Sequence, residues 1–171
     1  MLDVASNPSD AVEWALARFG DDIFRLAFSY MKTREDAEDV VQDVLIRYMQ
    51  SGKVFENENH VKAWLLRVSA NLCKDKLKSA SRQREVAIPE GYEAVAAEEE
   101  PKGASEVFQA VMALPEKYRS VIHLFYFEEY STAEIASILQ KKEATVRSLL
   151  KRGREKIEKM MKGDDGHAKG L

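Results

Sequence analysis

Apolar residues recur along most of this chain at intervals of three and four, the spacing that places them on one face of an α-helix. No stretch shows the sustained alternation of apolar and polar residues that is typical of a half-buried strand, and no internal repeat is present. Prolines, glycines and residues that favour helix ends divide the pattern into segments. The sequence therefore predicts an all-α protein.

The N-terminal half is expected to form four helices. Pro8 and Gly20 bracket the first, and the second spans about residues 21–31. The third spans residues 34–50, opens at a cap formed by Thr33 and Asp36, and ends at Gly52; a long helix then follows a loop at residues 53–59 and spans about 60–82. The positions expected to be buried in these helices are Val12, Leu16, Phe19, Ile23, Leu26, Ala27, Tyr30, Ala37, Val40, Val41, Val44, Leu45, Tyr48, Val61, Trp64, Leu65, Val68 and Leu72.

The C-terminal half is expected to begin with a helix that stops at Pro115, which then serves as the first residue of the next helix. Residues 131–161 read as two further helices joined by a tight turn. Ser131 precedes Glu134 by three residues, the spacing of a capping box. The expected buried positions are Val107, Val111, Leu114, Tyr118, Val121, Ile122, Leu124, Phe125, Ile135, Ile138, Leu139, Val146, Leu150, Gly153, Ile157 and Met160.

The last of these helices carries a basic outer face. Arg147, Lys151, Arg152 and Arg154 lie off its apolar stripe. A helix about 10–12 Å in diameter fits the major groove of B-DNA. The pattern favours a helix-turn-helix whose second helix reads DNA, although a basic face that is merely solvated gives the same pattern.

Charge is distributed unevenly. The net charge of −3 argues weakly against nucleic-acid binding, yet residues 60–84 contain seven basic residues and one aspartate. Residues 85–106 contain seven glutamates and one lysine, and residues 132–162 contain nine basic residues and four glutamates. Two basic blocks around an acidic one fit two DNA-contacting surfaces. We therefore expect a domain at residues 1–84, a flexible acidic linker at 85–103, a second domain at 104–162 and a disordered tail at 163–171.

Two outer faces in the first domain are further candidates for binding. Helix 34–50 carries an acidic edge, which is either solvated or suited to a basic helical partner. On helix 60–82, basic residues and Asn71 share one face, where they can contact phosphates and base edges. Trp64 fits the core better than a base-stacking platform. The acidic edge comprises Glu35, Asp36, Asp39, Gln42, Asp43 and Ile46, and the face of the long helix comprises Arg67, Asn71, Lys74, Asp75 and Lys78.

The composition of the chain argues against several other classes of protein. The 171 residues suit one or two small domains, and the single Cys73 allows no internal disulfide and fits a reducing cytoplasm. With only three histidines, a Cys/His metal site is not expected. No apolar run reaches the length of a membrane span, and the N-terminus lacks the features of a signal peptide. No glycine-rich phosphate loop and no nucleophile–base pair is recognisable, so we expect neither a cofactor nor an enzyme.

Four stretches carry a family resemblance. They are IFRLAFSYMKTREDAEDVVQDVLIRYM and AWLLRVSANLCKDKLKS in the first half, and LPEKYRSVIHLFYFEEYSTAEIASIL and TVRSLLKRGREKI in the second. In this order and separation they resemble the extracytoplasmic-function (ECF) group of RNA polymerase sigma factors, in the sigma-70 family. The resemblance covers roughly residues 10–160 and implies two helical domains on a flexible tether, one for the promoter −10 element and one for the −35 element.

The resemblance also implies roles for particular residues. Contacts with the clamp of core RNA polymerase are expected at Asp36, Asp39, Gln42 and Asp43. Recognition and opening of the −10 element, with a flipped-out base held by loop 53–59, are expected at Phe55, Asn57, Asn59, Lys62, Arg67, Asn71, Lys74, Asp75 and Lys78. Reading of the −35 element is expected at Lys142, Glu143, Thr145, Arg147, Ser148, Lys151 and Arg152. The polymerase flap and an anti-sigma factor are further partners that the resemblance implies.

The sequence departs from the family pattern near the helix-turn-helix. Gln140 and Lys141 stand where a glycine and an apolar residue are usual, Ala144 stands at another frequent glycine, and Leu149 stands at a frequent arginine. These differences bear on −35 specificity. A left-handed residue at Gln140 costs on the order of 1 kcal/mol, or the turn takes another shape.

Two other functional classes remain open at the level of the residues. A free-standing helix-turn-helix regulator that binds an operator as a dimer leaves the acidic edge and the basic face of helix 60–82 unexplained. Co-purification with core polymerase distinguishes a sigma factor from such a regulator. A helical adaptor protein without a DNA role would keep its affinity for its partners after Arg147 and Lys151 are both replaced by alanine, and it would support no template-directed transcription.

Overall fold

The computed structural model describes residues 7–87 and 105–168, including all of their side chains except those of 84–87 and 164–168. Within these ranges the chain forms helices and no strand, which confirms the all-α prediction. The chain divides into two compact units, Met1–Glu99 and Glu100–Leu171. Most of the expected linker lies outside the described residues; its first three residues continue the last helix of the first unit.

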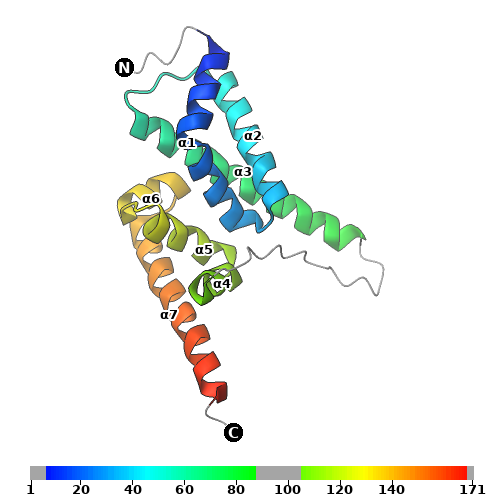
Figure 1. Ribbon diagram of the computed structural model, residues 1–171, viewed down its shortest axis with the longest axis vertical. Coiled ribbons are helices and arrows are strands. Elements are labelled where there is room, and N and C mark those ends of the chain that lie inside the picture. The colour runs from blue at the N-terminus through cyan, green and yellow to red at the C-terminus, as the bar shows by residue number, and fades with distance from the viewer. Residues whose placement is uncertain (1–6, 88–104, 169–171) are drawn as a thin grey trace. The chain divides into compact units, whose positions relative to one another are not determined.

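The described residues of the first unit form three helices, α1 (Pro8–Met31), α2 (Arg34–Ser51) and α3 (Glu58–Ala87), each of which packs against the other two (Figure 1). The expected helix 34–50 corresponds to α2, with Thr33 as its cap. Burial of apolar side chains between the three helices supplies the driving force for this packing. The most deeply buried side chains are Ala15, Ile23, Leu26, Ala27, Tyr30, Ala37, Val40, Val44, Val61, Leu65, Leu66, Ala70 and Cys73.

One helix stands where the sequence predicted two. Helix α1 runs without interruption through Gly20, which is buried rather than terminal. Because the helix is continuous, Ala15 and Phe19 lie on the side that also carries Ile23. Leu16, expected in the core, is 48% exposed.

The connection between α2 and α3 is shorter than expected. Gly52 ends α2 in the left-handed conformation at φ 59°, as the glycine predicted. The Asn57 side chain accepts a hydrogen bond from the backbone amide of His60 at 3.0 Å and so caps α3. Asn59 therefore lies in the first turn of α3 and not in the loop. Farther along α3, Trp64 is half-buried, not fully inside as expected.

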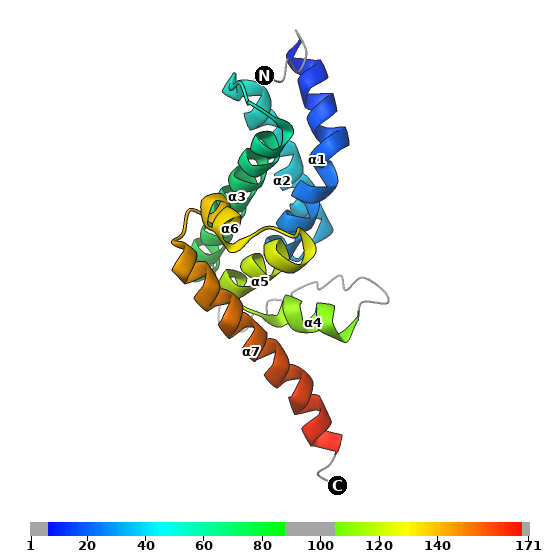
Figure 2. The ribbon, with the colours of Figure 1, turned by 90° about the vertical axis from the view of Figure 1, so that its left-hand side faces the viewer.

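Over residues 105–168, the second unit forms four helices and a π-helical turn. These are α4 (Glu106–Ala113), α5 (Glu116–Ile122), the turn η1 (His123–Phe127), α6 (Thr132–Leu139) and α7 (Glu143–Ala168). Helix α7 packs against α4, α5 and α6; Figures 1 and 2 show α6 beside its start and α4 farther along it. The core side chains are Ala110, Val111, Leu114, Tyr118, Val121, Ile122, Leu124, Ile135, Ile138, Leu139, Val146, Leu149 and Leu150.

Several details of this unit differ from expectation. Val107 is 46% exposed, whereas Leu149, which the apolar stripe omitted, is buried. Pro115 precedes α5 as its N-cap instead of forming its first residue. Helix α7 continues to Ala168, so residues 163–168 are helical where the sequence predicted a disordered tail; residues 169–171 lie outside the described part of the chain.

The junction between α6 and α7 combines a confirmed cap with a strained turn. The Ser131 hydroxyl accepts from the Glu134 amide at 3.1 Å, and the Glu134 carboxylate accepts from the Ser131 amide at 3.3 Å, which completes the predicted capping box. Gln140 ends α6 with φ 54° and ψ 48°. Of the two alternatives for this turn, the chain therefore adopts the left-handed one.

Candidate nucleic-acid interfaces

The acidic edge of α2 is largely exposed, but its side chains differ in the contacts that they make with the rest of the unit. The Thr33 hydroxyl donates to the Asp36 carboxylate at 2.8 Å, beside the helix cap. The Asp43 carboxylate lies 3.1 Å from the Lys76 ammonium on α3. Asp39 and Gln42 are exposed, and no contact to either side chain is found among the described residues. These two side chains are therefore the most accessible polar groups of the edge.

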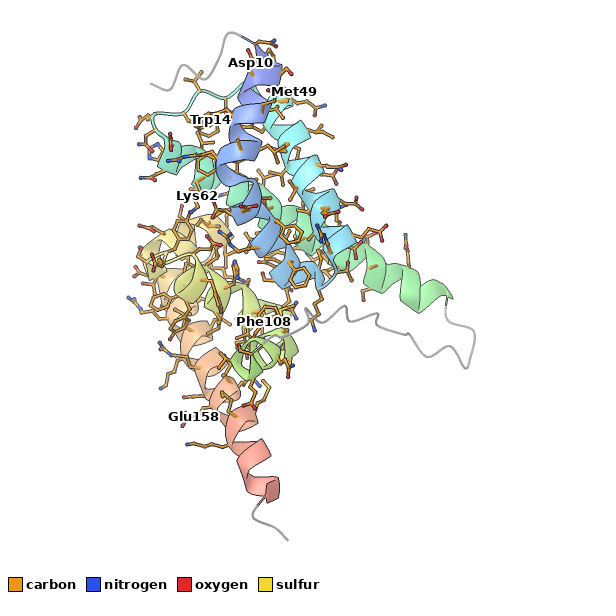
Figure 3. The ribbon with its side chains drawn as sticks, in the orientation of Figure 1. Asp10, Trp14, Met49, Lys62, Phe108 and Glu158 are labelled. Atoms are coloured by element: carbon orange, nitrogen blue, oxygen red, sulfur yellow. The ribbon has the colours of Figure 1, made fainter. Side chains whose placement is uncertain are left out.

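Apolar side chains continue this edge toward the end of α2. Ile46 and Met49 are each 47% exposed, and Met49 is labelled in Figure 3. Asp39, Gln42, Ile46 and Met49 follow one another at steps of three, four and three, so they form one stripe on the helix. A stripe with polar groups at one end and exposed apolar groups at the other is suited to a protein partner.

The loop before α3 is anchored by aromatic side chains. The Phe55 ring lies 6.2 Å from the Tyr48 ring and 5.8 Å from the Trp64 ring, measured between centroids. The Lys53 ammonium lies 5.7 Å from the Trp64 centroid, within the range of a cation–π interaction. Burial raises the pKa of the Tyr48 hydroxyl above its usual value. Val54, between the two anchored residues, is 69% exposed and is therefore an apolar side chain that the loop presents at its surface.

The expected face of α3 is present as one surface. Asn71, Asp75 and Lys78 are exposed, while Arg67 and Lys74 are half-buried on the same side of the helix. Because these five residues lie within three turns of one helix, their spacing is fixed by the helix itself. The arrangement combines positive charge with the amide of Asn71, which can donate to and accept from a base.

Lys62 does not belong to this face. Its ammonium lies 3.6 Å from the Asp22 carboxylate of α1, which also accepts from the Arg25 guanidinium at 2.7 Å. Five residues before Arg67, Lys62 falls on the opposite side of α3 (it is labelled in Figure 3). The structure therefore separates Lys62 from the face formed by Arg67, Asn71, Lys74, Asp75 and Lys78 and places it at the α1–α3 contact.

The start of α7 presents the expected −35 residues. Thr145, Arg147, Ser148, Lys151 and Arg152 are exposed, and Lys142 is exposed immediately before the helix. Glu143 is different because its carboxylate accepts from the Thr132 hydroxyl at 2.8 Å and from Arg147 at 3.2 Å. Glu143 thereby joins the first turns of α6 and α7.

Several residues with a place in these surfaces were not among the expected site residues. In the loop before α3 these are Lys53, which contacts Trp64, and its neighbour Val54; on α3 it is Lys76, which contacts Asp43. In the second unit, the Arg154 guanidinium donates to the Tyr126 hydroxyl at 3.0 Å. Its spacing in the sequence already placed Arg154 on the basic outer face of α7, although not among the residues expected to read the −35 element. Tyr126 had no such signal, because it lies in the π-helical turn η1, which breaks the helical period.

The described residues offer no centre for metal chemistry. No three histidine, cysteine, aspartate or glutamate side chains gather there as a metal site would require. None of the helices over the described ranges has the length and apolar character needed to cross a membrane.

Comparison with known proteins connects these surfaces to a family. Residues 16–83 match Sigma-70 region 2, and residues 105–157 match Sigma-70, region 4. RNA polymerase sigma factor SigV of Bacillus subtilis is 30% identical over 132 residues, which cover 77% of this chain and 79% of SigV. The chain belongs to the ECF sigma factors of the sigma-70 family. A sigma factor directs promoter-specific transcription initiation and is not itself an enzyme.

Two further relatives of this sigma factor are ECF sigma factors. ECF sigma factor SigE of Mycolicibacterium smegmatis is 31% identical over 167 residues, which cover 92% of this chain but only 65% of SigE. ECF sigma factor SigW of Bacillus subtilis is 29% identical over 174 residues, covering 93% of each chain.

Two solved structures share the fold. The sigma factor RpoE in complex with the anti-sigma factor NepR from Bartonella quintana gives a TM-score of 0.70 at 22% identity, over 88% of this chain and 96% of RpoE. CnrH in complex with the cytosolic domain of CnrY gives a TM-score of 0.65 at 23% identity, over 93% and 92% of the two chains. The all-α arrangement is therefore one that known sigma factors adopt.

Proposed function

We propose that this sigma factor binds core RNA polymerase through α2, engages the −10 element through α3 and the preceding loop, and reads the −35 element through α7. One observation carries the proposal. Each unit of the chain exposes a basic helical face, and the first unit exposes in addition a separate acidic and apolar stripe. Two faces suit DNA, and the stripe suits a protein.

Polymerase binding is assigned first to Asp39 and Gln42, because both side chains are exposed and make no hydrogen bond or ion pair with the described residues. Asp36 and Asp43 contribute at the margins of the same edge. Exposed Ile46 and Met49 add apolar area that a protein partner can bury. Contact with the polymerase clamp at α2 and with the flap at the second unit is the arrangement that we propose.

The test of this assignment is a charge reversal at the centre of the edge. Asp39→Lys should weaken binding to purified core polymerase at least tenfold, which corresponds to about 1.4 kcal/mol. Glu13→Lys is the matched control, since Glu13 is exposed on a different helix, α1, and undergoes the same change of charge. Equal affinities for both variants, measured by fluorescence titration, would remove α2 from the proposed polymerase interface.

Promoter opening is assigned to the face of α3 and to the loop. Arg67, Lys74 and Lys78 supply positive charge for phosphates, and Asn71 supplies hydrogen bonds for a base. Asp75 shares this face, and Asn59 stands exposed at the start of the helix. Holding one unstacked base favours open DNA, because its binding offsets the few kcal/mol of unstacking.

Within the loop, the roles of two expected residues are indirect. Phe55 packs on Tyr48 and Trp64 and therefore positions the loop, and Asn57 caps α3. Asn71→Ala should reduce permanganate reactivity of the opened −10 region while leaving polymerase affinity unchanged. Ser79→Ala, an exposed position on the same helix, is the control. Equal opening by both variants contradicts the role of Asn71.

The −35 element is assigned to the first three turns of α7. Arg147 and Lys151 are the principal contacts, with Lys142, Thr145, Ser148 and Arg152 around them. Glu143 acts by holding Arg147 and by joining α7 to Thr132. Leu149 points into the core, so the position where the family often has arginine contributes no contact here.

An anti-sigma factor and a cytoplasmic location complete the proposal. Two proteins of the same fold, RpoE and CnrH, were solved with anti-sigma partners. Their likeness supports the expectation that an inhibitory protein covers this sigma factor. Affinity purification of the full chain from its own host should recover core polymerase and one further protein that competes with it.

The decisive experiment is run-off transcription with purified core polymerase on a genomic library, followed by mapping of the start sites. A sigma factor yields a defined set of start sites that share −10 and −35 elements. A free-standing regulator instead forms a dimer with operator affinity and no polymerase binding. An adaptor keeps its partner affinity after Arg147 and Lys151 are both replaced by alanine and yields no start sites.

A further inference from the structure

Tyr126 and Arg154 form a contact that joins two distant parts of the second unit. The Arg154 Nη1 donates a hydrogen bond to the Tyr126 hydroxyl at 3.0 Å, across 28 positions of sequence. Tyr126 is 48% exposed, and Arg154 is exposed on α7. The Tyr126 ring is itself fixed by an edge contact with Phe125, at 5.0 Å between centroids and 78° between planes. The guanidinium is thus held at a defined point on the surface.

The pair leaves hydrogen-bond donors available at that point. A guanidinium has five N–H donors, of which this contact uses one. The Tyr126 hydroxyl accepts from Arg154, so its own hydrogen can donate elsewhere, and no acceptor for it is found among the described residues. Several donors beside a fixed positive charge match the oxygens of a phosphate.

The acidic residue one turn after Arg154 on α7 is engaged elsewhere. Glu158 lies four residues after Arg154, a spacing at which the two could pair. Its carboxylate instead accepts from the Lys162 ammonium at 2.6 Å, and this hydrogen bond lowers the pKa of Glu158 (labelled in Figure 3). The charge of Arg154 is therefore not cancelled by Glu158.

Arg154 also continues the surface assigned to the −35 element. It follows Arg147 by seven residues and Lys151 by three, so the three basic side chains share one side of α7. Seven residues correspond to an advance of about 10 Å along the helix. If the first turns of α7 enter the major groove, a basic residue about two turns farther on lies level with the groove edge, where the phosphates are.

We propose that Tyr126 and Arg154 together bind one backbone phosphate that flanks the −35 element. Arg154 supplies the charge, and Tyr126 both holds the guanidinium and donates its hydroxyl hydrogen. Pre-positioning reduces the side-chain freedom that Arg154 loses on binding. This inference rests on the proposed −35 function and adds two residues from outside the expected set.

The first test measures how DNA binding depends on salt. Holoenzyme reconstituted from core polymerase and the full chain is titrated with a duplex that carries a mapped promoter, over a series of salt concentrations. Because each neutralised phosphate contributes about 0.9 to the slope of log K against log salt, Arg154→Ala should lower that slope by about 1. Lys159→Ala, which removes an exposed charge farther along the same helix without releasing Glu158, should leave the slope unchanged.

Two conservative variants separate binding from folding. Arg154→Lys should keep the slope but weaken binding, because an ammonium cannot reproduce the planar fork. Tyr126→Phe keeps the ring and removes the hydroxyl, and it should weaken binding about three- to tenfold. A melting temperature lowered in Tyr126→Phe and Arg154→Ala, with slope and affinity as in the unsubstituted protein, would show that the contact serves only to hold η1 against α7.

A second test identifies the phosphate itself. Neutral methylphosphonate groups are placed one at a time around the −35 element of the same duplex. The unsubstituted protein should lose affinity at one position to which Arg154→Ala is insensitive, and equal profiles would overturn the inference. Failure of the proposed function looks different, because the unsubstituted holoenzyme would then select no promoter at all.

Discussion

Gln140 connects the two helices of the helix-turn-helix at an energetic cost that a single substitution should remove. Its backbone lies in the left-handed region, φ 54° and ψ 48°, where the Cβ of any residue except glycine crowds the following carbonyl. The Gln140 side chain is exposed and makes no contact found in the described residues. Gln140→Gly therefore relieves strain without removing packing.

The expected gain follows from two opposing terms. Relief of the left-handed strain is worth about 1–2 kcal/mol. Glycine offsets roughly 0.5–1 kcal/mol of this gain, because the unfolded protein has more conformational freedom at a glycine and loses it on folding. The net gain of about 0.5–1 kcal/mol should raise the melting temperature of the second unit by about 2–8 °C.

Differential scanning calorimetry of the full chain measures this shift, with the first unit as an internal reference. Gln140→Ala is the matched control, since alanine removes the side chain but keeps the strain, and its melting temperature should equal that of the unsubstituted protein. Equal melting temperatures for the glycine and alanine variants would refute the reasoning.

Three further substitutions test the packing and the capping of the helices, and one should raise and two should lower the free energy of unfolding. Gly20→Ala should stabilise the first unit by about 0.5–1 kcal/mol in a denaturant titration, because α1 is continuous there and the new Cβ meets only the exposed side chain of Leu16, with Cδ1 at 3.0 Å and Cγ at 3.8 Å. Gly153→Ala, the same change, should destabilise the second unit by about 1–3 kcal/mol, because its Cβ would lie 3.1 Å from Cγ1 of the buried Ile122; a stabilised variant would contradict this packing. Ser131→Ala should cost the second unit about 1 kcal/mol by removing the cap of α6, and Ser131→Thr should restore most of it in the same titration.

Much of the fold could be predicted because the helical period is strong. The stripes that contain Ile23, Val40 and Ile135 mark helices whose buried sides the structure confirms. Gly20 misled the prediction because a glycine inside a helix and one at its end look alike in sequence. Leu149 was left out of the core because it lies at the edge of the α7 stripe, where burial depends on the neighbouring helices.

For the candidate site, prediction from the sequence is limited in a different way. Sequence periodicity identifies which residues share a face, and it grouped Asn71 and Lys78 correctly. It does not reveal partners that are distant in sequence. Lys62 meets Asp22 forty positions away, and Glu143 meets Thr132 on the preceding helix. Such contacts decide whether a polar side chain is available to a ligand, and they depend on how the helices pack.

The ion pair between Asp43 and Lys76 joins the edge assigned to polymerase with the helix assigned to promoter DNA. Lys76 follows Arg67 by nine residues and therefore lies on the side of α3 opposite the face assigned to DNA. The pair thus holds α3 against α2 while the other side of α3 remains turned toward the promoter. For a half-exposed pair, this contribution to the packing of the two helices is on the order of a few tenths of a kcal/mol to 1 kcal/mol. A polymerase that engages Asp43 would therefore act on how firmly α3 is held against α2, and not on the charge that α3 presents to DNA.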